Sequence, residues 1–231
     1  QAHFVFELLQ NAEDAKATEV TFTLTSEGCR FEHNGSKLFD EGDVRAITGI
    51  HNSSKKKSAD QIGKFGVGFK SVFVYTVSPE ITSGEYSFRI SRLVMPEECS
   101  GVVVKSGWTR FWLPFNNPKK PADLAHQEVA AGLRELAETT LLFLSNIHTI
   151  SWAIEGADHG YVLRVEHDDE HVEVLKQTNG KKTSSAHFLR FTEAVEGLPN
   201  QRVAIAFALE FLQGKESLQT GLPLAQQLKV A

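Results

Sequence analysis

Hydrophobic residues recur at helical spacing in the first segment of the chain. Between Phe4 and Ala15 they form one stripe, and Glu7, Asn11 and Asp14 fall together on the opposite side. This spacing predicts an amphipathic helix with three polar groups on one face. The chain starts with Gln1, and no N-cap residue precedes the helix, so we expect natural sequence ahead of this residue.

The next pattern has a period of two. Val20, Phe22 and Leu24 alternate with polar residues in segment 19–25, and segment 29–33 follows across a short polar turn. Alternation of this kind is typical of half-buried strands, so the two segments predict a β-hairpin. After the hairpin, the acidic cluster at 40–43 predicts the N-cap of a short helix.

Three glycines precede an apolar segment in the middle of the chain. Gly63, Gly66 and Gly68 lead into Phe69, which begins a helix-like run that ends at Tyr75. Glycine lets the backbone approach a ligand closely, and a helix N-terminus offers unpaired N–H groups, so the pattern suits a phosphate. The alternative is a tight turn that only packs a helix on a sheet.

A change of character follows residue 115. A Pro- and Asn-containing linker precedes a predicted helix from Asp123 to Ser145, and strand-like runs then dominate. These runs are 149–154, 161–165, 172–175, 187–191 and 203–211. We therefore predict two domains, residues 1–146 and a β-rich, incomplete second lobe at 147–231.

Composition restricts the class of protein. The 231 residues are 41% hydrophobic and 23% charged, with a formal net charge of -5. No apolar run is long enough to cross a membrane, and an acidic balance argues against direct nucleic-acid binding. Cys29 and Cys99 lie far apart without a metal-binding spacing, which favours a reducing, intracellular and therefore cytoplasmic setting.

The polar face of the first helix carries candidate chemistry. Glu7 and Asn11 lie one turn apart and point toward the same place. A carboxylate can take a proton from an attacking water, and an amide oxygen is an acceptable ligand for Mg²⁺. The alternative is a solvated helix surface.

Four motifs occur in order over residues 4 to 112. They are Glu7-x-x-x-Asn11-x-x-Asp14-Ala15, Asn34-Gly35 after a strand, the glycine-rich segment GKFGVGFKS at 63–71, and Gly107-Trp108-Thr109 before a strand. Together they resemble the GHKL (Bergerat-fold) ATPase superfamily, and most of all the sacsin and No-vein branch and the ninety-kilodalton heat-shock chaperones. The resemblance implies an α/β two-layer sandwich with a mixed, mainly antiparallel sheet.

The resemblance also implies roles for individual residues. Glu7 would be the general base that activates water, and Asn11 would be the Mg²⁺ ligand that also touches the phosphates. Asp14 would shape the nucleotide pocket, and Thr109 would help to hold the base. The backbone of the glycine-rich loop would cradle the β- and γ-phosphates, and Lys64 and Lys70 would lie nearby as candidate countercharges. The loop consists of Gly63, Lys64, Phe65, Gly66, Val67, Gly68 and Phe69.

One motif departs from the family pattern. The family's Asp-x-Gly-x-Gly reads here as His33-Asn34-Gly35-Ser36-Lys37, so the aspartate that accepts from the adenine amino group is absent. A neutral imidazole and a side-chain amide each have one acceptor, so His33 or Asn34 could receive that proton. The alternative is that His33 only ends a strand and packs.

The resulting functional expectation is an Mg²⁺-dependent ATP-binding module. It would bind ATP and ADP, hydrolyse ATP slowly, and couple closure of a lid at 48–61 to movement in a larger chaperone-like or defence-type protein. Two alternatives remain open, namely a nucleotide-sensing module without turnover and a phosphotransferase acting in trans. ATP-dependent dimerisation is also open. A polar run from His167 to His171 contains metal-capable side chains, but its position between strands equally suits a solvated turn.

Overall fold

The computed structural model describes residues 3–49, 68–100, 102–197 and 202–231. The helices in these ranges are α1 (Phe4–Asp14), α2 (Glu41–Thr48), α3 (Ala122–Arg134) and α4 (Thr139–Leu142), with 3₁₀ helices η1 (Phe69–Val74) and η2 (Leu224–Gln226). The strands are β1 (Glu19–Leu24), β2 (Gly28–His33), β3 (Glu80–Ser83), β4 (Tyr86–Ser91), β5 (Met95–Glu98), β6 (Thr109–Pro114), β7 (Thr149–Ile154), β8 (His159–Glu166), β9 (His171–Thr178), β10 (Lys181–Ala194), β11 (Arg202–Phe211) and β12 (Leu228–Val230).

The strands form one sheet. Its order is β12-β11-β10-β9-β8-β7-β1-β2-β6-β3-β4-β5. β1 and β7 pair in parallel, whereas the other pairs in the described residues, such as β1 with β2 and β2 with β6, are antiparallel. The sheet is therefore mixed and mainly antiparallel, as the sequence predicted.

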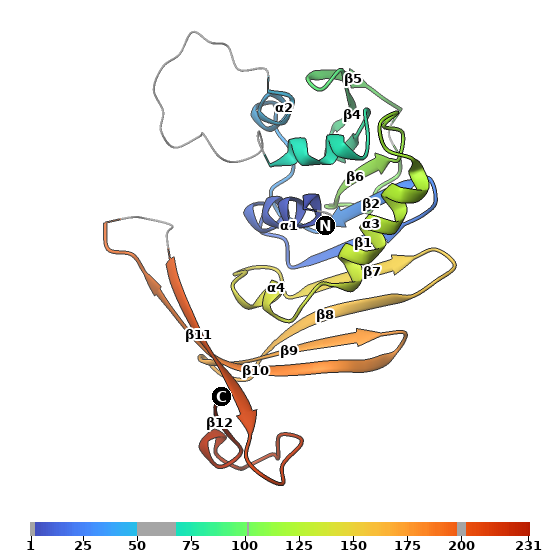
Figure 1. Cartoon of the computed structure of the whole chain (residues 1–231). Helices are drawn as coiled ribbons and strands as arrows, with labels where there is room; N and C mark the ends of the chain where they lie inside the picture. The colour runs from blue at the N-terminus through green and yellow to red at the C-terminus, as the bar shows by residue number, and fades with distance from the viewer. Residues whose placement is uncertain (1–2, 50–67, 101, 198–201) are drawn as a thin grey trace.

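Helices cover one face of this sheet. In β1, Val20, Phe22 and Leu24 are buried while the residues between them are partly exposed. Figure 1 shows α1, α3 and α4 on the same side of the central strands. One buried hydrophobic cluster fills the space between the two layers, and it includes Phe4 from α1 and Val129 from α3. The two-layer α/β architecture is confirmed.

Residues 147–231 are rich in strands, as expected, and these strands extend the same sheet. β7 lies beside β1 in register, with Glu19 opposite Thr149. The carboxylate of Glu13, near the end of α1, accepts the backbone N–H groups of Asn146 and Ile147 at 2.9 and 3.1 Å. This contact fixes the first helix against the start of β7. The boundary at residue 146 stays a prediction.

The predicted helix from Asp123 to Ser145 was wrong in extent. Its N-cap is Pro121, α3 ends at Arg134, and the separate α4 follows. The buried guanidinium of Arg164 donates to the carbonyl oxygens of Leu141 and Ser145, at 2.9 and 3.2 Å, and to that of Leu144. These carbonyls therefore turn toward a strand residue from later in the chain, which a continuous helix would not allow.

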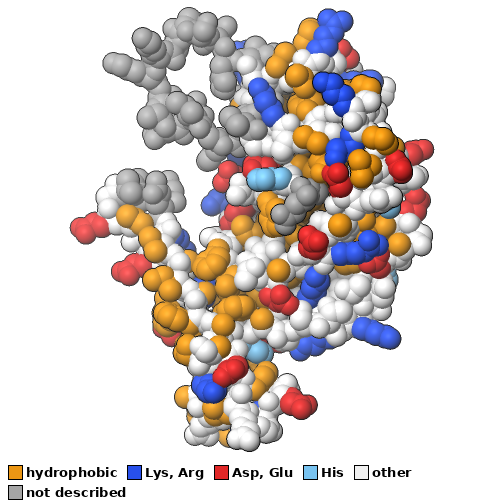
Figure 2. Space-filling view, viewed as in Figure 1, with side chains coloured by type: hydrophobic (Ala, Val, Ile, Leu, Met, Phe, Trp, Pro, Cys, Tyr) orange, Lys and Arg blue, Asp and Glu red, His pale blue; other side chains and the backbone are white. Residues whose placement is uncertain are grey.

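The surface carries one extended apolar feature. Along the β10–β11 hairpin the side chains of Phe191, Val203, Ile205 and Phe207 are each more than two-fifths exposed. Figure 2 shows hydrophobic side chains gathered over this part of the molecule. Within the described residues, no helix has the length and hydrophobicity that crossing a membrane requires.

Candidate functional site

The two polar residues singled out on α1 lie at the border of the core. The side chain of Glu7 is 25% exposed, and Asn11, one turn later, is only 7% exposed as a residue. The apolar stripe of α1 packs into the core, and this orientation places the polar face at the edge of the layer. Asp14 is exposed at the end of the helix, and its role in shaping a pocket stays a prediction.

Glu7 contacts the segment that precedes η1. A Cβ atom added to Gly68 would lie 1.8 Å from Glu7 Oε2 and 2.6 Å from Glu7 Cδ. The φ and ψ angles of Gly68 are -64° and -44°, which any residue adopts, so space alone requires glycine here. The fold therefore brings together the predicted base and the last glycine of the glycine-rich segment, 61 positions apart in the sequence.

Asn11 has an unusual environment for a buried amide. Its Nδ2 atom is buried and has no hydrogen-bond partner among the described residues. A buried amide without a partner costs about 1–3 kcal/mol, so folded proteins rarely keep one without a reason. An N–H donor of this kind suits a phosphate oxygen, and an amide oxygen is an acceptable ligand for a hard cation such as Mg²⁺.

Only the end of the glycine-rich segment, from Gly68, lies within the described residues. Gly63, Lys64, Phe65, Gly66 and Val67 lie outside the described residues, and so does most of the predicted lid at 48–61. The side chain that follows Gly68, Phe69, is buried in the core at 1% exposure. The segment after the glycines forms the 3₁₀ helix η1 rather than an α-helix. Lys70 is exposed, and its Nζ would lie 3.5 Å from a Cβ added to Gly49 at the end of α2.

His33 ends β2 and is 2% exposed. Its Nδ1 atom accepts the backbone N–H of Gly35 at 3.1 Å, so the neutral ring carries its proton on Nε2. Burial lowers the pKa of His33 from 6.5 to about 4, which keeps the ring neutral at pH 7. The other ring nitrogen of His33, Nε2, is therefore a donor.

The neighbouring residues of this motif are also committed to local contacts. Asn34 Oδ1 accepts the N–H groups of Thr18 and Glu19 at 2.8 and 2.9 Å, and its Nδ2 donates to Thr18 Oγ1. A Cβ on Gly35 would lie 2.8 Å from Ala15 Cβ, so this glycine lets the strand end approach α1. The structure does not support the expectation that His33 or Asn34 accepts an adenine amino proton, because both acceptor atoms are occupied.

Thr109 lies beside His33 in the sheet. The two residues are opposite each other on β6 and β2, and Ser83 on β3 is opposite Thr109 on its other side. Thr109 is fully buried, and its hydroxyl shares a 2.6 Å hydrogen bond with Ser83 Oγ. Sequence reasoning missed Ser83, because only the register of three antiparallel strands places it in this row.

We expect the buried His33 to make folding sensitive to acid. Its pKa is lower in the folded state than in the unfolded chain, so the unfolded state binds more protons between pH 6.5 and 4. Stability is then complete above pH 6.5 and falls by up to roughly 3 kcal/mol toward pH 4. Urea denaturation across this range, compared with His33→Asn, measures the effect, since asparagine keeps an acceptor for the Gly35 N–H.

Three other histidines contribute in the same direction. Burial lowers the pKa values of His148, His171 and His187, and they are present in both proteins. The difference between the two pH profiles therefore isolates His33. Parallel profiles would contradict the assignment of a buried neutral ring at this position.

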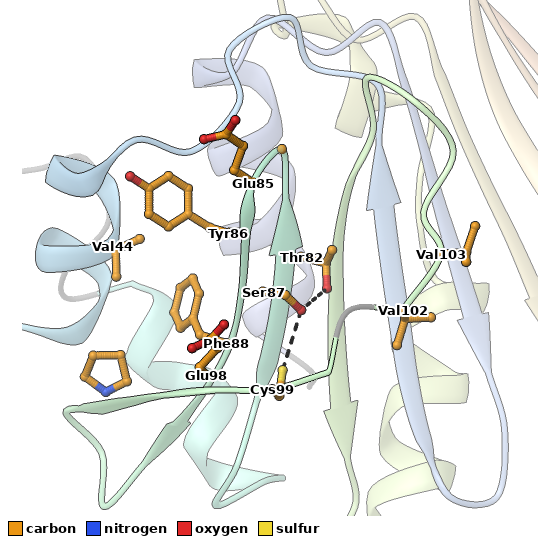
Figure 3. Close-up of a pocket in the computed structure, with 12 residues that line it drawn as sticks. Val44, Thr82, Glu85, Tyr86, Ser87, Phe88, Glu98, Cys99, Val102 and Val103 are labelled. Carbon is orange, nitrogen blue, oxygen red and sulfur yellow. Dashed lines mark hydrogen bonds between the residues drawn. The ribbon is translucent and has the colours of Figure 1, made fainter.

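A pocket of about 560 Å³ lies elsewhere on the molecule, between α2, β3, β4 and the segment around residue 102. Figure 3 shows Ser87 between Thr82 and Cys99. The Ser87 hydroxyl oxygen lies 3.2 Å from the hydroxyl oxygen of Thr82 and 3.6 Å from the sulfur atom of Cys99. Among the described residues, none of those predicted for the nucleotide site lines the pocket. We assign it no role.

The site carries sequence similarity to a known family. The Sacsin domain model matches residues 31–91, which include the His33 motif, the glycine-rich segment and η1. The chain is sacsin-like in this segment. Protein NO VEIN of Arabidopsis thaliana is 26% identical over 243 residues, and sacsin of Homo sapiens is 33% identical over 98 residues. These matches confirm the resemblance to sacsin and NO VEIN.

The chain spans only a small part of the length of these relatives. It covers 9% of the length of NO VEIN and 2% of the length of sacsin, while the alignments include 92% and 34% of this chain. Among solved structures, the B-subunit of DNA gyrase from Myxococcus xanthus has a TM-score of 0.46 at 11% identity, over 75% of this chain and 60% of that one. The Aquifex aeolicus MutL ATPase domain complexed with ADP has a TM-score of 0.42 at 14% identity, over 79% and 82%. At these scores the structural likeness does not constrain function.

Proposed function

We propose that the chain is an Mg²⁺-dependent nucleotide-binding module that binds ATP and hydrolyses it slowly. The observation that carries this proposal is the buried Nδ2 atom of Asn11, which has no hydrogen-bond partner among the described residues and lies one turn from the partly exposed carboxylate of Glu7. A hydrophobic residue at position 11 would avoid the free-energy cost of burying an N–H donor without a partner. A ligand that accepts from the amide explains why a polar group is kept there.

In this proposal some residues bind the phosphates and Mg²⁺, and another takes up a proton. Asn11 donates to a phosphate oxygen and offers its amide oxygen to Mg²⁺, which would neutralise phosphate charge when bound. Glu7 accepts the proton of the attacking water, and Gly68 leaves the space that its carboxylate occupies. Lys70 adds positive charge at the exposed edge, and the glycine-rich segment ahead of Gly68 supplies backbone N–H groups to the phosphates.

Asn11→Ala tests the binding proposal directly. We expect it to weaken binding of a non-hydrolysable ATP analogue by about 10- to 100-fold, the loss typical of a hydrogen bond to a charged group. Thermal stability should stay unchanged or rise, because the variant removes a buried donor without a partner. Calorimetry with and without Mg²⁺ measures the first effect, and thermal unfolding measures the second.

The matched control is Gln10→Ala, an exposed position on the same helix. It should bind as the parent does. Equal affinity of Asn11→Ala and the parent would remove Asn11 from the site. Absence of binding by the folded parent at millimolar nucleotide would overturn the proposed function itself.

With His33 at this position, we expect the module to discriminate little between the adenine and guanine bases of its nucleotide ligand. Because Nε2 is a donor and the Asn34 acceptor is occupied, we expect ATP to be favoured over GTP by less than about tenfold. A site that pairs with a particular polar group can discriminate by about 10⁴-fold or more. His33→Asp should raise the preference for ATP, because a carboxylate accepts from the adenine amino group.

Paired calorimetric titrations with ATP and GTP analogues measure both ratios. Asn34 and Gly35 remain unchanged in the variant, so we expect their contacts with Thr18 and Ala15, and with them the local fold, to be kept. A preference for ATP of a hundredfold or more in the parent would show that some other acceptor reads the base.

The larger context is also part of the proposal. Both relatives are much longer than this chain, so we infer that the module acts within a longer polypeptide and passes nucleotide-driven movement to its other domains. Nucleotide-dependent pairing of two copies fits the same role. Cys29 and Cys99 are free thiols, which is compatible with a reducing, intracellular compartment.

A further inference from the structure

Three histidines that are separated in the sequence meet at one end of the β8–β10 ribbon. His167 follows β8, His171 begins β9, and His187 lies on β10. One ring nitrogen from each lies within 4.8 Å of the others. The sequence pointed only to the first two, in a turn, because His187 joins them through strand pairing.

The strand register places the cluster on one face. His187 is opposite Glu173 across the β9–β10 pair, and His171 is two residues before Glu173 on the same strand. Residues two apart in a strand share a face, so His171, Glu173 and His187 point to the same side. The backbone N–H of His167 donates to the backbone carbonyl of His171 at 2.9 Å and closes the turn between β8 and β9. The ring of His167 lies beside the other two rings.

The distances suit a shared ion. His171 Nε2 and His187 Nδ1 are 3.0 Å apart. Two nitrogens bound tetrahedrally to one Zn²⁺ at 2.0–2.1 Å are separated by about 3.3 Å. His171 and His187 are buried at 2% and 5% exposure, whereas His167 is exposed and its ring stacks on that of His171 with the centroids 4.6 Å apart.

Glu173 supports the outer nitrogens of the cluster. Its Oε2 lies 2.8 Å from His167 Nε2, and its Oε1 lies 3.8 Å from His187 Nε2. Ser185 Oγ donates to Oε1 at 2.6 Å and holds the carboxylate in place. When His187 binds an ion through Nδ1, its Nε2–H faces this carboxylate, which is the usual outer-shell partner of a metal-bound histidine.

The cluster also has an open side. A cavity of about 530 Å³ is bounded by His167 and His171 on one side and by the segment 218–227 on the other. An ion can enter from this cavity, and a water or an external ligand can occupy a coordination position that faces it. The ring of Phe211 packs edge-on against the ring of His187, with the two ring centroids 5.2 Å apart.

We propose that His167, His171 and His187 form a Zn²⁺ site, with three imidazole ligands and a fourth position that faces the cavity. Three imidazoles suit Zn²⁺ and related transition metals better than Mg²⁺ or Ca²⁺, which prefer oxygen. The bound ion would hold the β8–β9 turn against β10. This site is independent of the nucleotide site, because none of its residues belongs to α1, β2 or η1.

The test is Zn²⁺ titration of the chelator-treated whole chain without nucleotide, in competition with a chromophoric chelator. We expect one tight equivalent and a higher melting temperature with the ion. His171→Gln and His187→Gln should each weaken binding at least about 10- to 100-fold. His159→Gln, an exposed histidine on β8, is the matched control and should bind as the parent does.

His167→Gln provides a second variant that should not disturb packing, since this ring is exposed. It should also weaken binding, and Co²⁺ should give the visible absorption of a tetrahedral site in the parent but not in this variant. Unchanged Zn²⁺ affinity in His167→Gln, or in a folded His187→Gln, would overturn the three-histidine site. A parent that binds no tight equivalent would show that the His171–His187 contact is only a hydrogen bond.

Discussion

Glu7→Gln is expected to slow single-turnover ATP hydrolysis by about 10²- to 10⁴-fold, the usual contribution of general-base catalysis. Glutamine keeps the size of the side chain but cannot take a proton from water. Nucleotide affinity should change little, because the carboxylate of Glu7 takes up the proton of the attacking water only in the transition state and not when the nucleotide binds. Rapid-quench measurement of ADP formation with enzyme in excess gives the rate, and calorimetry gives the affinity.

The control for this variant is again Gln10→Ala, which lies on the same helix and faces solvent. It separates a local loss of chemistry from a general effect on α1. If Glu7→Gln hydrolyses ATP as fast as the parent, another group activates the water. If the parent binds nucleotide but has no measurable turnover, the chain is a nucleotide-sensing module.

Gly68→Ala should cause a comparable loss by moving the same carboxylate. The new methyl group would lie 1.8 Å from the present position of Glu7 Oε2, so the side chain must turn away. A small misplacement of a catalytic group can cost about 10²-fold in rate. Alanine suits the backbone angles of residue 68, so the free energy of unfolding should change by less than about 1 kcal/mol.

The double variant distinguishes this explanation from a separate role for Gly68. If alanine acts only by displacing Glu7, then Gly68→Ala together with Glu7→Gln should be no slower than Glu7→Gln alone. Rates that multiply would contradict the coupling. Single-turnover rates and thermal unfolding of all four proteins complete the cycle.

The sequence by itself determined the elements that local interactions specify. The hairpin of β1 and β2 follows from alternation, and the register pairs Val20 with His33 around a short turn. The helix α2 begins where the acidic cluster predicted, because Asp40 and Asp43 cap each other's backbone N–H groups. These patterns involve residues within a few positions of one another, and their physical causes are present before the chain folds.

The candidate residues Glu7 and Asn11 were also identified from the sequence, because a one-turn spacing puts two side chains on one face of a helix. Their environment was not. Only the packed molecule shows that Asn11 Nδ2 is buried without a partner among the described residues and that Glu7 contacts Gly68. The burial of Asn11 Nδ2 and the contact between Glu7 and Gly68 both depend on how distant segments pack in the folded core.

Tertiary contacts also decided the chemistry of His33 and the extent of α3. The backbone turn at Gly35 and the approach of Ala15 fix which nitrogen of His33 carries the proton, and no spacing rule contains that information. Arg164 draws the carbonyls of residues 141, 144 and 145 away from helical geometry, although the hydrophobic pattern continues through them. His187 reaches His171 in the same way, through a strand pairing that the sheet register creates. In each case the deciding partner lies far along the chain or is oriented by the folded backbone, so the local sequence could not specify it.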